Sequence, residues 1–165
     1  MDVGWALPVA WVTLGVTVVV ASVLAGRSHR AYVVGVRGLG LLFVVAGAGA
    51  NAFFLIRGDD YSGFADGAST TFVQDTWESL VVPHHHFFIG LLIAFEAAVG
   101  LLVLVEGRAR QTALALQLAF TAALVSFGWG FLVWALPIGV ALVLLHRAGD
   151  VAATHEVTTK EGALS

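Results

Sequence analysis

The stretch TALALQLAFTAALVSFGWGFLVWALPIGVALVLLH, residues 112–146, decides how many helices this chain forms. One straight helix of this length would measure roughly 50 Å, whereas the hydrocarbon core of a bilayer is about 30 Å thick. The motif Gly-Trp-Gly at 128–130 favours a tight turn with an interfacial aromatic, and Pro137 follows it. We therefore predict two short helices, over 112–128 and 131–146.

The whole chain has a membrane-like composition. Of its 165 residues, 59% are hydrophobic and 12% are charged, whereas soluble domains carry roughly 25% charged residues. A net charge of -3 without a basic stripe argues against a nucleic-acid partner. The absence of cysteine excludes disulfides and thiolate chemistry. We expect one all-α integral membrane domain over residues 1–150, in contact with the lipid bilayer, and a polar, mobile tail over 151–165.

Three further apolar segments precede the opening stretch, at residues 5–26, 31–56 and 84–105. The first follows Asp2 with no basic residue ahead of it, so it lacks the n-region of a signal peptide and should be retained. Together the segments predict a compact bundle of five transmembrane helices. The alternative is a four-helix bundle, in which residues 112–146 form a single span.

The basic residues favour five spans with the N-terminus outside. The positive-inside rule then predicts a plasma (cell inner) membrane protein with a cytoplasmic C-terminus. Tryptophans near the predicted outer interface indicate an aromatic belt: Trp5, Trp11, Trp77, Trp129 and Trp134. In this orientation only Arg57 faces outward, and the cytoplasmic basic residues are Arg27, Arg30, Arg37, Arg108, Arg110, Arg147 and Lys160.

An acidic outer loop spans residues 57–83. Its second half has apolar residues at helical spacing, which predicts a short amphipathic helix on the outer face of the bundle. Thr71 with Gln74 matches a capping box. Within the spans, small residues recur at every fourth position, which predicts close helix packing there; these stripes are Gly90, Ala94 and Ala98, and Ala115, Ala119 and Ala123. A glycine-rich second span lining a cavity is the alternative.

Glu96 is the most informative residue, because it lies within the third apolar segment. An ionised carboxylate at this depth is costly, so it should face the interior, pair with a polar group or stay protonated. Asn51 and Gln117 are the expected partners, since a lone amide is also costly there. Glu96 either fixes helix packing or serves as a ligand-binding or proton-coupled site. His85, eleven positions earlier, would share its face about 16 Å away.

Three consecutive histidines, His84, His85 and His86, stand where the outer loop enters the third span. Asp75 and Glu78 precede them at a spacing that could bring the carboxylates close to the imidazoles. Such ligands suit zinc, copper or iron, so a transition-metal site is one hypothesis. The others are a set of interfacial hydrogen-bonding groups and a pH-sensitive or ligand site.

Two segments, FEAAVGLLVLVEGRARQTALALQLAF at 95–120 and GLGLLFVVAGAGANAFFLIRGDDYSGFAD at 38–66, resemble the DoxX-like family of small membrane proteins. The shared features are a glutamate entering a Gly-Leu-rich half-helix, a short basic turn and an Ala-Leu helix. Glu96 and the basic pair Arg108 and Arg110 are the most distinctive points.

The resemblance covers roughly residues 35–146. It implies a four-helix core made of the second to fifth segments, with the first as an addition. The founding member is associated with a quinone-linked thiosulfate-oxidising complex, so the resemblance implies a quinone as a possible cofactor. A lysine common after the family's first core helix is missing here, where residues 51–57 read NAFFLIR.

Four hypotheses about function follow, and none assigns a catalytic residue. The first is a DoxX-like membrane subunit that binds a small lipophilic partner, a quinone or lipid, near Glu96. The second is a small-solute or ion transporter with the outer histidine and acid cluster as its entry site. The third is a metal-binding membrane enzyme, and the fourth is a structural accessory subunit. Each is compatible with a membrane partner subunit or an oligomer.

Overall fold

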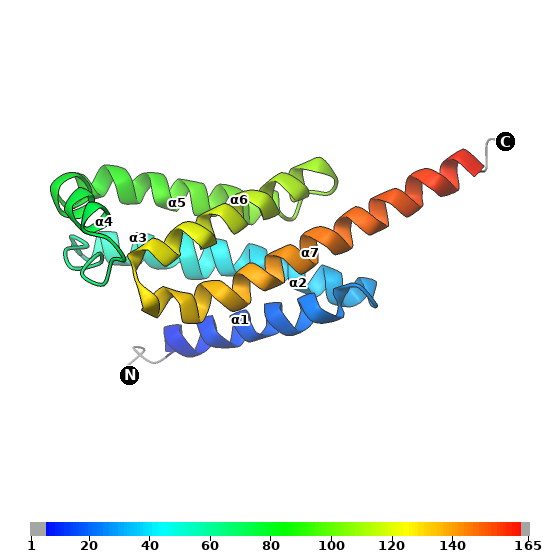
Figure 1. Ribbon diagram of the computed structural model, residues 1–165, viewed down its shortest axis with the longest axis horizontal. Helices are drawn as coiled ribbons and strands as arrows, with labels where there is room; N and C mark the ends of the chain where they lie inside the picture. Colours follow the sequence, from blue (N-terminus) through cyan, green and yellow to red (C-terminus); the bar gives the residue numbers. More distant parts are fainter. Residues whose placement is uncertain (1–5, 163–165) are drawn as a thin grey trace.

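The computed structural model describes residues 6–162, with side-chain environments for residues 8–149. Within 6–162 the regular elements are all helical. The bundle in Figure 1 confirms the all-α prediction. Its elements are α1 (Ala6–Ala25), α2 (His29–Leu41), the π-helical η2 (Leu42–Gly49), α3 (Ala50–Ile56), α4 (Thr71–Thr76), η3 (Trp77–Val81), η4 (Val82–His84), α5 (His85–Leu102), α6 (Arg108–Leu124), η5 (Val125–Phe127) and α7 (Trp129–Gly162).

These elements join into antiparallel rods that run up and down the bundle (Figure 1). The long loop at 57–70, the start of α1 and the turn between α6 and α7 lie at one end, which we call the loop end. The short turns at 26–28 and 103–107 lie at the opposite end. The alternation of the rods therefore matches the five-helix arrangement expected from the apolar segments.

Four of the described helices are long and apolar enough to cross a membrane: Pro8–Ala25, His29–Ile56, Thr71–Leu102 and Trp129–Gly149. The remaining rod, α6, has 17 residues. A single 3-10 turn, η5, extends it to Phe127. The short fourth span expected from the sequence is therefore present as a helix of marginal length.

The break between α6 and α7 falls at Gly128, which confirms that residues 112–146 form two helices. Gly128 has a φ of +122°, a conformation that side-chain-bearing residues rarely adopt. Its Cα also lies against the backbone of Gly67 in the long loop, where a Cβ would collide with the Gly67 carbonyl. Ser69 fixes this contact, because its backbone N–H donates to the Ser126 carbonyl over 2.8 Å.

A close helix crossing joins α5 to the segment formed by α2 and η2. A Cβ on Gly100 would lie 2.7 Å from Val44 Cγ2 and 3.1 Å from the Gly40 carbonyl oxygen. The predicted small-residue stripes are wrong as packing surfaces: Ala94 and Ala98 are exposed, Gly90 has open space beside it, and Ala115, Ala119 and Ala123 are exposed on α6.

The first helix belongs to the bundle rather than lying beside it. It packs against α2 along its length and against α7. Val18 is fully buried in the core that these helices share. Apolar side chains of α2, α5, α6 and α7 complete that core, including Leu39, Val99, Leu114 and Leu142.

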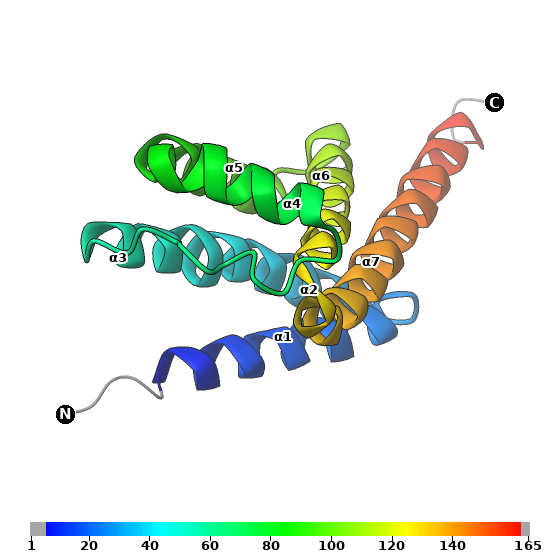
Figure 2. The same ribbon diagram turned by 60° about the vertical axis from the view of Figure 1, so that its left-hand side comes forward.

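Residues 71–83, the second half of the predicted outer loop, are helical as expected, but they continue directly into α5 through η3 and η4 (Figure 2). The N-cap of this segment is Thr70, whose Oγ1 accepts from the Val73 N–H, so the predicted capping residue Thr71 is wrong by one position. At the other end of the chain α7 continues to Gly162, beyond the predicted end at 146. The last residues of the predicted tail, 163–165, lie outside the described residues.

Candidate functional site

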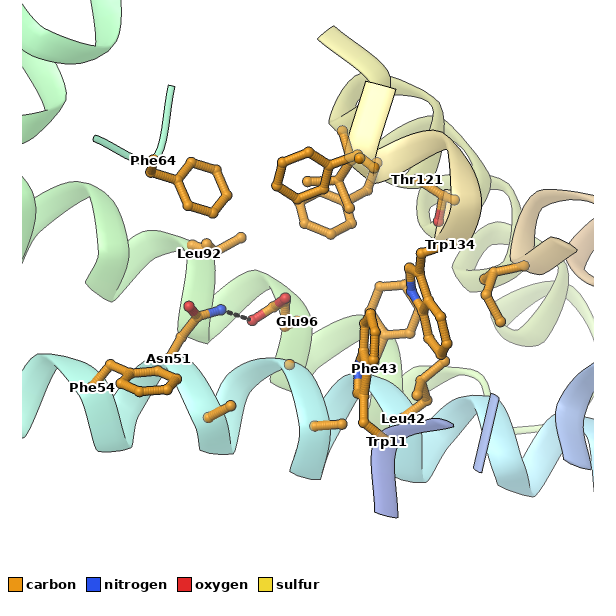
Figure 3. Close-up of a pocket in the computed structure, with 18 of the residues that line it drawn as sticks. Trp11, Leu42, Phe43, Asn51, Phe54, Phe64, Leu92, Glu96, Thr121 and Trp134 are labelled. Carbon is orange, nitrogen blue, oxygen red and sulfur yellow. Dashed lines mark hydrogen bonds between the residues drawn. The ribbon is translucent and has the colours of Figure 1, made fainter. Parts of the chain in front are cut away.

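A pocket of about 540 Å³ opens in the loop-end half of the bundle (Figure 3). Such a volume fits a small organic molecule, since ligand pockets span roughly 300–1,000 Å³. One wall is formed by small residues of the second rod, which consists of α2, η2 and α3. These residues are Ala46, Gly47 and Ala50. The alternative of a glycine-rich second span lining a cavity is thereby confirmed. Aromatic rings form much of the rest: Trp11, Phe43, Phe54, Tyr61, Phe64, Trp77, Phe120, Phe131 and Trp134.

Glu96 lies in the pocket wall as the one carboxylic acid among the described lining residues. Its side chain comes from the middle of α5, and the residue is only 6% exposed. Asn51 Nδ2 on α3 donates to Glu96 Oε2 over 2.9 Å, which confirms the predicted Asn51 partner (Figure 3). Among the described residues, the second oxygen, Oε1, has no hydrogen-bonding partner.

The carboxyl group fits there because Gly47 has no side chain. A Cβ at Gly47 would lie 2.8 Å from Glu96 Oε1 and 2.9 Å from Cδ. Gly47 belongs to η2, a π-helical stretch of eight residues inside an otherwise α-helical rod. Such widened turns are rare and frequently mark functional sites. Here the widened segment supplies Leu42, Phe43, Ala46 and Gly47 to the pocket.

A chain of hydrogen bonds connects this carboxyl to the long loop at 57–70 and to η3. Asn51 holds Glu96 with its side chain and accepts at its backbone carbonyl from the Tyr61 hydroxyl, over 2.9 Å. The Tyr61 carbonyl in turn accepts from Trp77 Nε1, also over 2.9 Å. The loop, α3 and α5 are therefore joined at the pocket.

Tyr61 occupies a strained backbone position, with a φ of +59°. A bulky residue in this region costs of order 1–3 kcal/mol and persists only where its surroundings impose it. Three contacts do so here: its N–H donates to Asp59 Oδ1, its hydroxyl to Asn51, and its carbonyl accepts from Trp77. Burial, with the charges of Asp59 and Glu96 adding to it, raises the pKa of the Tyr61 hydroxyl, so this group stays a neutral donor.

Gln117, the other predicted partner, does not reach Glu96. It is fully buried, and its Nε2 donates to the Val99 carbonyl on α5 over 3.2 Å. Its Oε1 is buried without a hydrogen-bonding partner in the described structure. Thr121, one turn further along α6, donates to the Gln117 carbonyl and lines the pocket. Gln117 thus ties α6 to α5 beside the pocket rather than within it.

Aromatic contacts close the loop end of the pocket. Phe64 stacks on Trp77 with ring centroids 4.9 Å apart, and both contact Phe127. On the side wall, Trp11 of α1 stacks on Trp134 of α7 at 3.5 Å. These tryptophans, which we expected to serve an interfacial belt, line the pocket. Trp129 is 84% exposed, as a belt residue would be, and Trp5 lies outside the described residues.

The predicted metal ligands are not brought together. His84 Nδ1 and His85 Nδ1 hydrogen-bond to the carbonyls of Leu80 and Val82, one turn back along the same rod. His85 and His86 have ring centroids 4.2 Å apart, but the carboxylates of Asp75 and Glu78 are exposed on the preceding turns. Within the described residues no group of three His, Asp or Glu side chains could hold a metal ion. The transition-metal hypothesis therefore has no geometric support.

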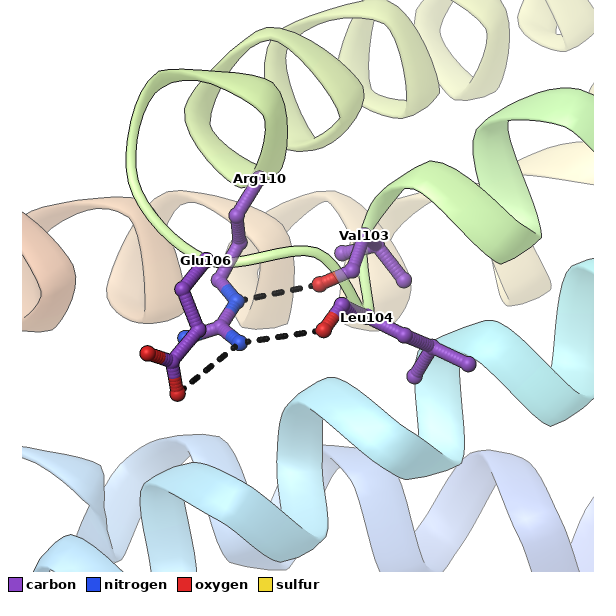
Figure 4. Close-up of polar contacts among 4 residues, drawn as sticks. All are labelled: Val103, Leu104, Glu106 and Arg110. Atoms are coloured by element: carbon purple, nitrogen blue, oxygen red, sulfur yellow. Dashed lines mark hydrogen bonds and ion pairs between the residues drawn. The ribbon is translucent and has the colours of Figure 1, made fainter.

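The basic turn at the opposite end has a structural role. Arg110 Nε donates to the Val103 carbonyl over 3.0 Å, and Nη2 donates to the Leu104 carbonyl over 3.4 Å (Figure 4). These carbonyls follow the end of α5, where helix geometry leaves acceptors unsatisfied. The exposed Glu106 lies 4.0 Å from the same guanidinium, and the Tyr32 ring lies beneath it. Arg110 thus caps α5 and holds the turn to α6.

Comparison with protein-family models, with curated proteins and with solved structures found no match to this chain. The DoxX-like resemblance stays a sequence-based expectation.

Sequence reasoning missed Tyr61, Gly47 and the aromatic walls. Tyr61 left a weak signal, as a tyrosine in a loop otherwise rich in acids and glycines. Gly47 was one of several glycines in its segment, and only its contact with Glu96 distinguishes it.

Proposed function

We propose that this protein is a multi-pass plasma-membrane protein that binds a small lipophilic molecule with a polar head group beside Glu96. A single observation carries the proposal: a nearly buried carboxyl group, with one oxygen unpartnered, in the wall of a 540 Å³ aromatic pocket. An acid at such a position in a membrane helix is a functional-site hypothesis by default. A mostly apolar pocket with a few convergent polar groups is the usual form of a small-molecule site.

The geometry favours binding over a purely structural role for the acid. If Glu96 only locked the helices, Asn51 would satisfy that need, and the pocket next to it would serve no purpose. Interiors are normally packed with few voids larger than a water molecule. The resemblance of residues 35–146 to DoxX-like proteins favours a quinone among the candidate ligands, and a lipid is the other.

The test is ligand content and ligand binding of the purified full-length protein. Organic extracts of protein purified in detergent are examined by mass spectrometry, and binding of a short-chain quinone, its quinol and a lysolipid is followed by tryptophan fluorescence. Trp11, Trp77 and Trp134 line the pocket and should report occupancy. Glu96→Gln should weaken binding about tenfold, since hydrogen bonds to charged groups contribute about 1.5–3 kcal/mol.

Glu106→Gln is the matched control, because Glu106 is 91% exposed at the opposite end of the bundle. It should bind as the unchanged protein does. If Glu96→Gln also reduces thermal stability, a second variant separates ligand binding from helix locking. In Gly47→Ala the new methyl group displaces the Glu96 side chain from its position but leaves the carboxyl group in the protein. Unchanged ligand content and unchanged binding in both pocket variants would refute the proposal.

A further inference from the structure

The described lining of the pocket has acidic groups but no basic side chain. Its described lining contains one carboxylic acid, Glu96, and one phenol, Tyr61, but no lysine, arginine or histidine. The other polar groups there are the side chains of Asn51 and Thr121 and the indole N–H groups of the tryptophans. An ionised carboxylate buried here would need a paired charge, and the described lining residues supply none. A positive group on the ligand would supply it.

Two oxygen acceptors at the acid are left free in the pocket. Asn51 uses its Nδ2 on Glu96, so its Oδ1 remains, and Glu96 keeps Oε1 free. Figure 3 shows the Asn51 and Glu96 side chains beside one another, with Phe64 above them and Phe54 below Asn51. Among the described residues no donor reaches either atom. These acceptors match a ligand that brings hydrogen-bond donors or a positive charge.

Aromatic faces surround the same space, which also suits a cation. A positive group within about 6 Å of a ring centroid is attracted by the electron-rich face. The cations of the described chain use other rings, since Arg57 lies over Phe53 and Arg110 over Tyr32. Neither ring lines the pocket. These two arginines therefore leave the pocket rings to other groups. Trp11 with Trp134 and Phe64 with Trp77 stack on one another, and a ligand cation would contact the remaining ring surface of the lining.

The pocket also has exposed residues on its side, toward the surface that the membrane hypothesis assigns to lipid. Val12 of α1 is 52% exposed, Phe54 of α3 is 44% exposed and Val133 of α7 is 81% exposed, yet all three line the pocket. At this side α3 packs on α5 but makes few contacts with α1. Figure 2 shows that α1 and α3 diverge. A molecule dissolved in the bilayer can reach Glu96 by this side.

From these observations we infer that the ligand class is a lipophilic cation: an amine, quaternary ammonium or phosphonium with aromatic or alkyl substituents, held against Glu96. This inference rests on the proposed function and narrows it. The carboxylate supplies the counter-charge, Asn51 holds it in place, and the rings of the pocket contact the substituents.

The test compares pairs of probes that match in shape and differ in charge. Tetraphenylphosphonium and tetraphenylborate are offered to the full-length protein, with binding followed by tryptophan fluorescence and calorimetry. Benzyltrimethylammonium and its uncharged isostere neopentylbenzene form a smaller pair, in case the larger ions do not fit. Each cation should bind at least about tenfold more tightly than its partner, Glu96→Gln should remove that preference, and Glu106→Gln should retain it.

The pH dependence provides a second readout. A proton and a cation compete for the same carboxylate, so cation affinity should rise with pH and become pH-independent in Glu96→Gln. Tyr61 is the other titratable group facing the site. Because its pKa is raised above the ordinary tyrosine value of about 10, its hydroxyl stays neutral below that pH. Asn51 and Gly47 from the second rod and Thr121 from α6 do not titrate.

Equal binding of both members of both pairs, or a cation preference that survives Glu96→Gln, overturns the inference. Binding of the neutral quinone without either cation overturns it as well, but leaves the proposed function standing. If no probe binds and no small molecule co-purifies, the proposed function and this inference both fail.

Discussion

The crossing of α5 over the second rod can be tested with two glycines of the same helix. Gly100→Ala places a methyl group 2.7 Å from Val44 Cγ2, 3.0 Å from Phe43 Cβ and 3.1 Å from the Gly40 carbonyl oxygen. The last two neighbours belong to or adjoin the backbone and cannot rotate away. The helices must separate by several tenths of an ångström, and such overpacking costs about 1–3 kcal/mol.

Gly90→Ala is the control, because nothing lies within 4 Å of a Cβ at that position. Both substitutions gain the same helix propensity of about 1 kcal/mol, so their difference isolates the packing cost. Thermal unfolding in one detergent should place Gly100→Ala below Gly90→Ala by about 2–4 °C for each kcal/mol. Equal unfolding temperatures, or the reverse order, would show that this crossing is not as close as described.

Three further predictions follow from the site and its surroundings. Tyr61→Phe removes the hydroxyl that donates to Asn51 and should lower the free energy of unfolding by about 1 kcal/mol. Because the folded-state pKa of Tyr61 is raised, that contribution should be intact below about pH 10 and lost as pH rises further; a pH-independent difference up to strong alkali would count against it. Arg110→Met should lower the free energy of unfolding by about 1–3 kcal/mol, because it loses the hydrogen bonds to the Val103 and Leu104 carbonyls. Chemical denaturation measures this loss, and the control Arg108→Met should leave the free energy of unfolding nearly unchanged. Gln117→Leu should change the free energy of unfolding by less than about 1 kcal/mol in the same measurement, because it removes an unsatisfied buried oxygen together with one hydrogen bond. A larger loss would mean that Gln117 Oε1 has a partner such as water.

The helices could be predicted because the signals for them are local. Apolar runs of membrane length and the motif at 128–130 are both visible in the sequence, and the structure places a helix break at Gly128. The Asn51–Glu96 pair was also predictable, because two costly polar groups inside apolar segments stabilise each other when they meet. Gln117 met the same criterion but found a backbone carbonyl instead, a choice that depends on helix rotation.

Packing surfaces and most of the pocket lining could not be predicted, because they depend on which face each helix turns inward. Alanine and glycine stripes recur often in a chain this rich in small residues, and in lipid an exposed alanine carries little penalty. The stripe at Gly90, Ala94 and Ala98 therefore faces outward, whereas Gly100 makes the close crossing. Tyr61 reaches the site only through a left-handed backbone turn, which tertiary contacts impose and no local pattern announces.

The two roles proposed for Glu96 depend on different oxygens. Oε2 bonds Asn51 and so joins α5 to α3, whereas Oε1 lies against Gly47 without a bonded partner. Glutamine preserves the first role, since its carbonyl oxygen still accepts from Asn51, but it abolishes the negative charge on which a cation would depend. A stable Glu96→Gln protein that no longer distinguishes ligands by charge would assign the fold to the hydrogen bond and the selectivity to the carboxylate.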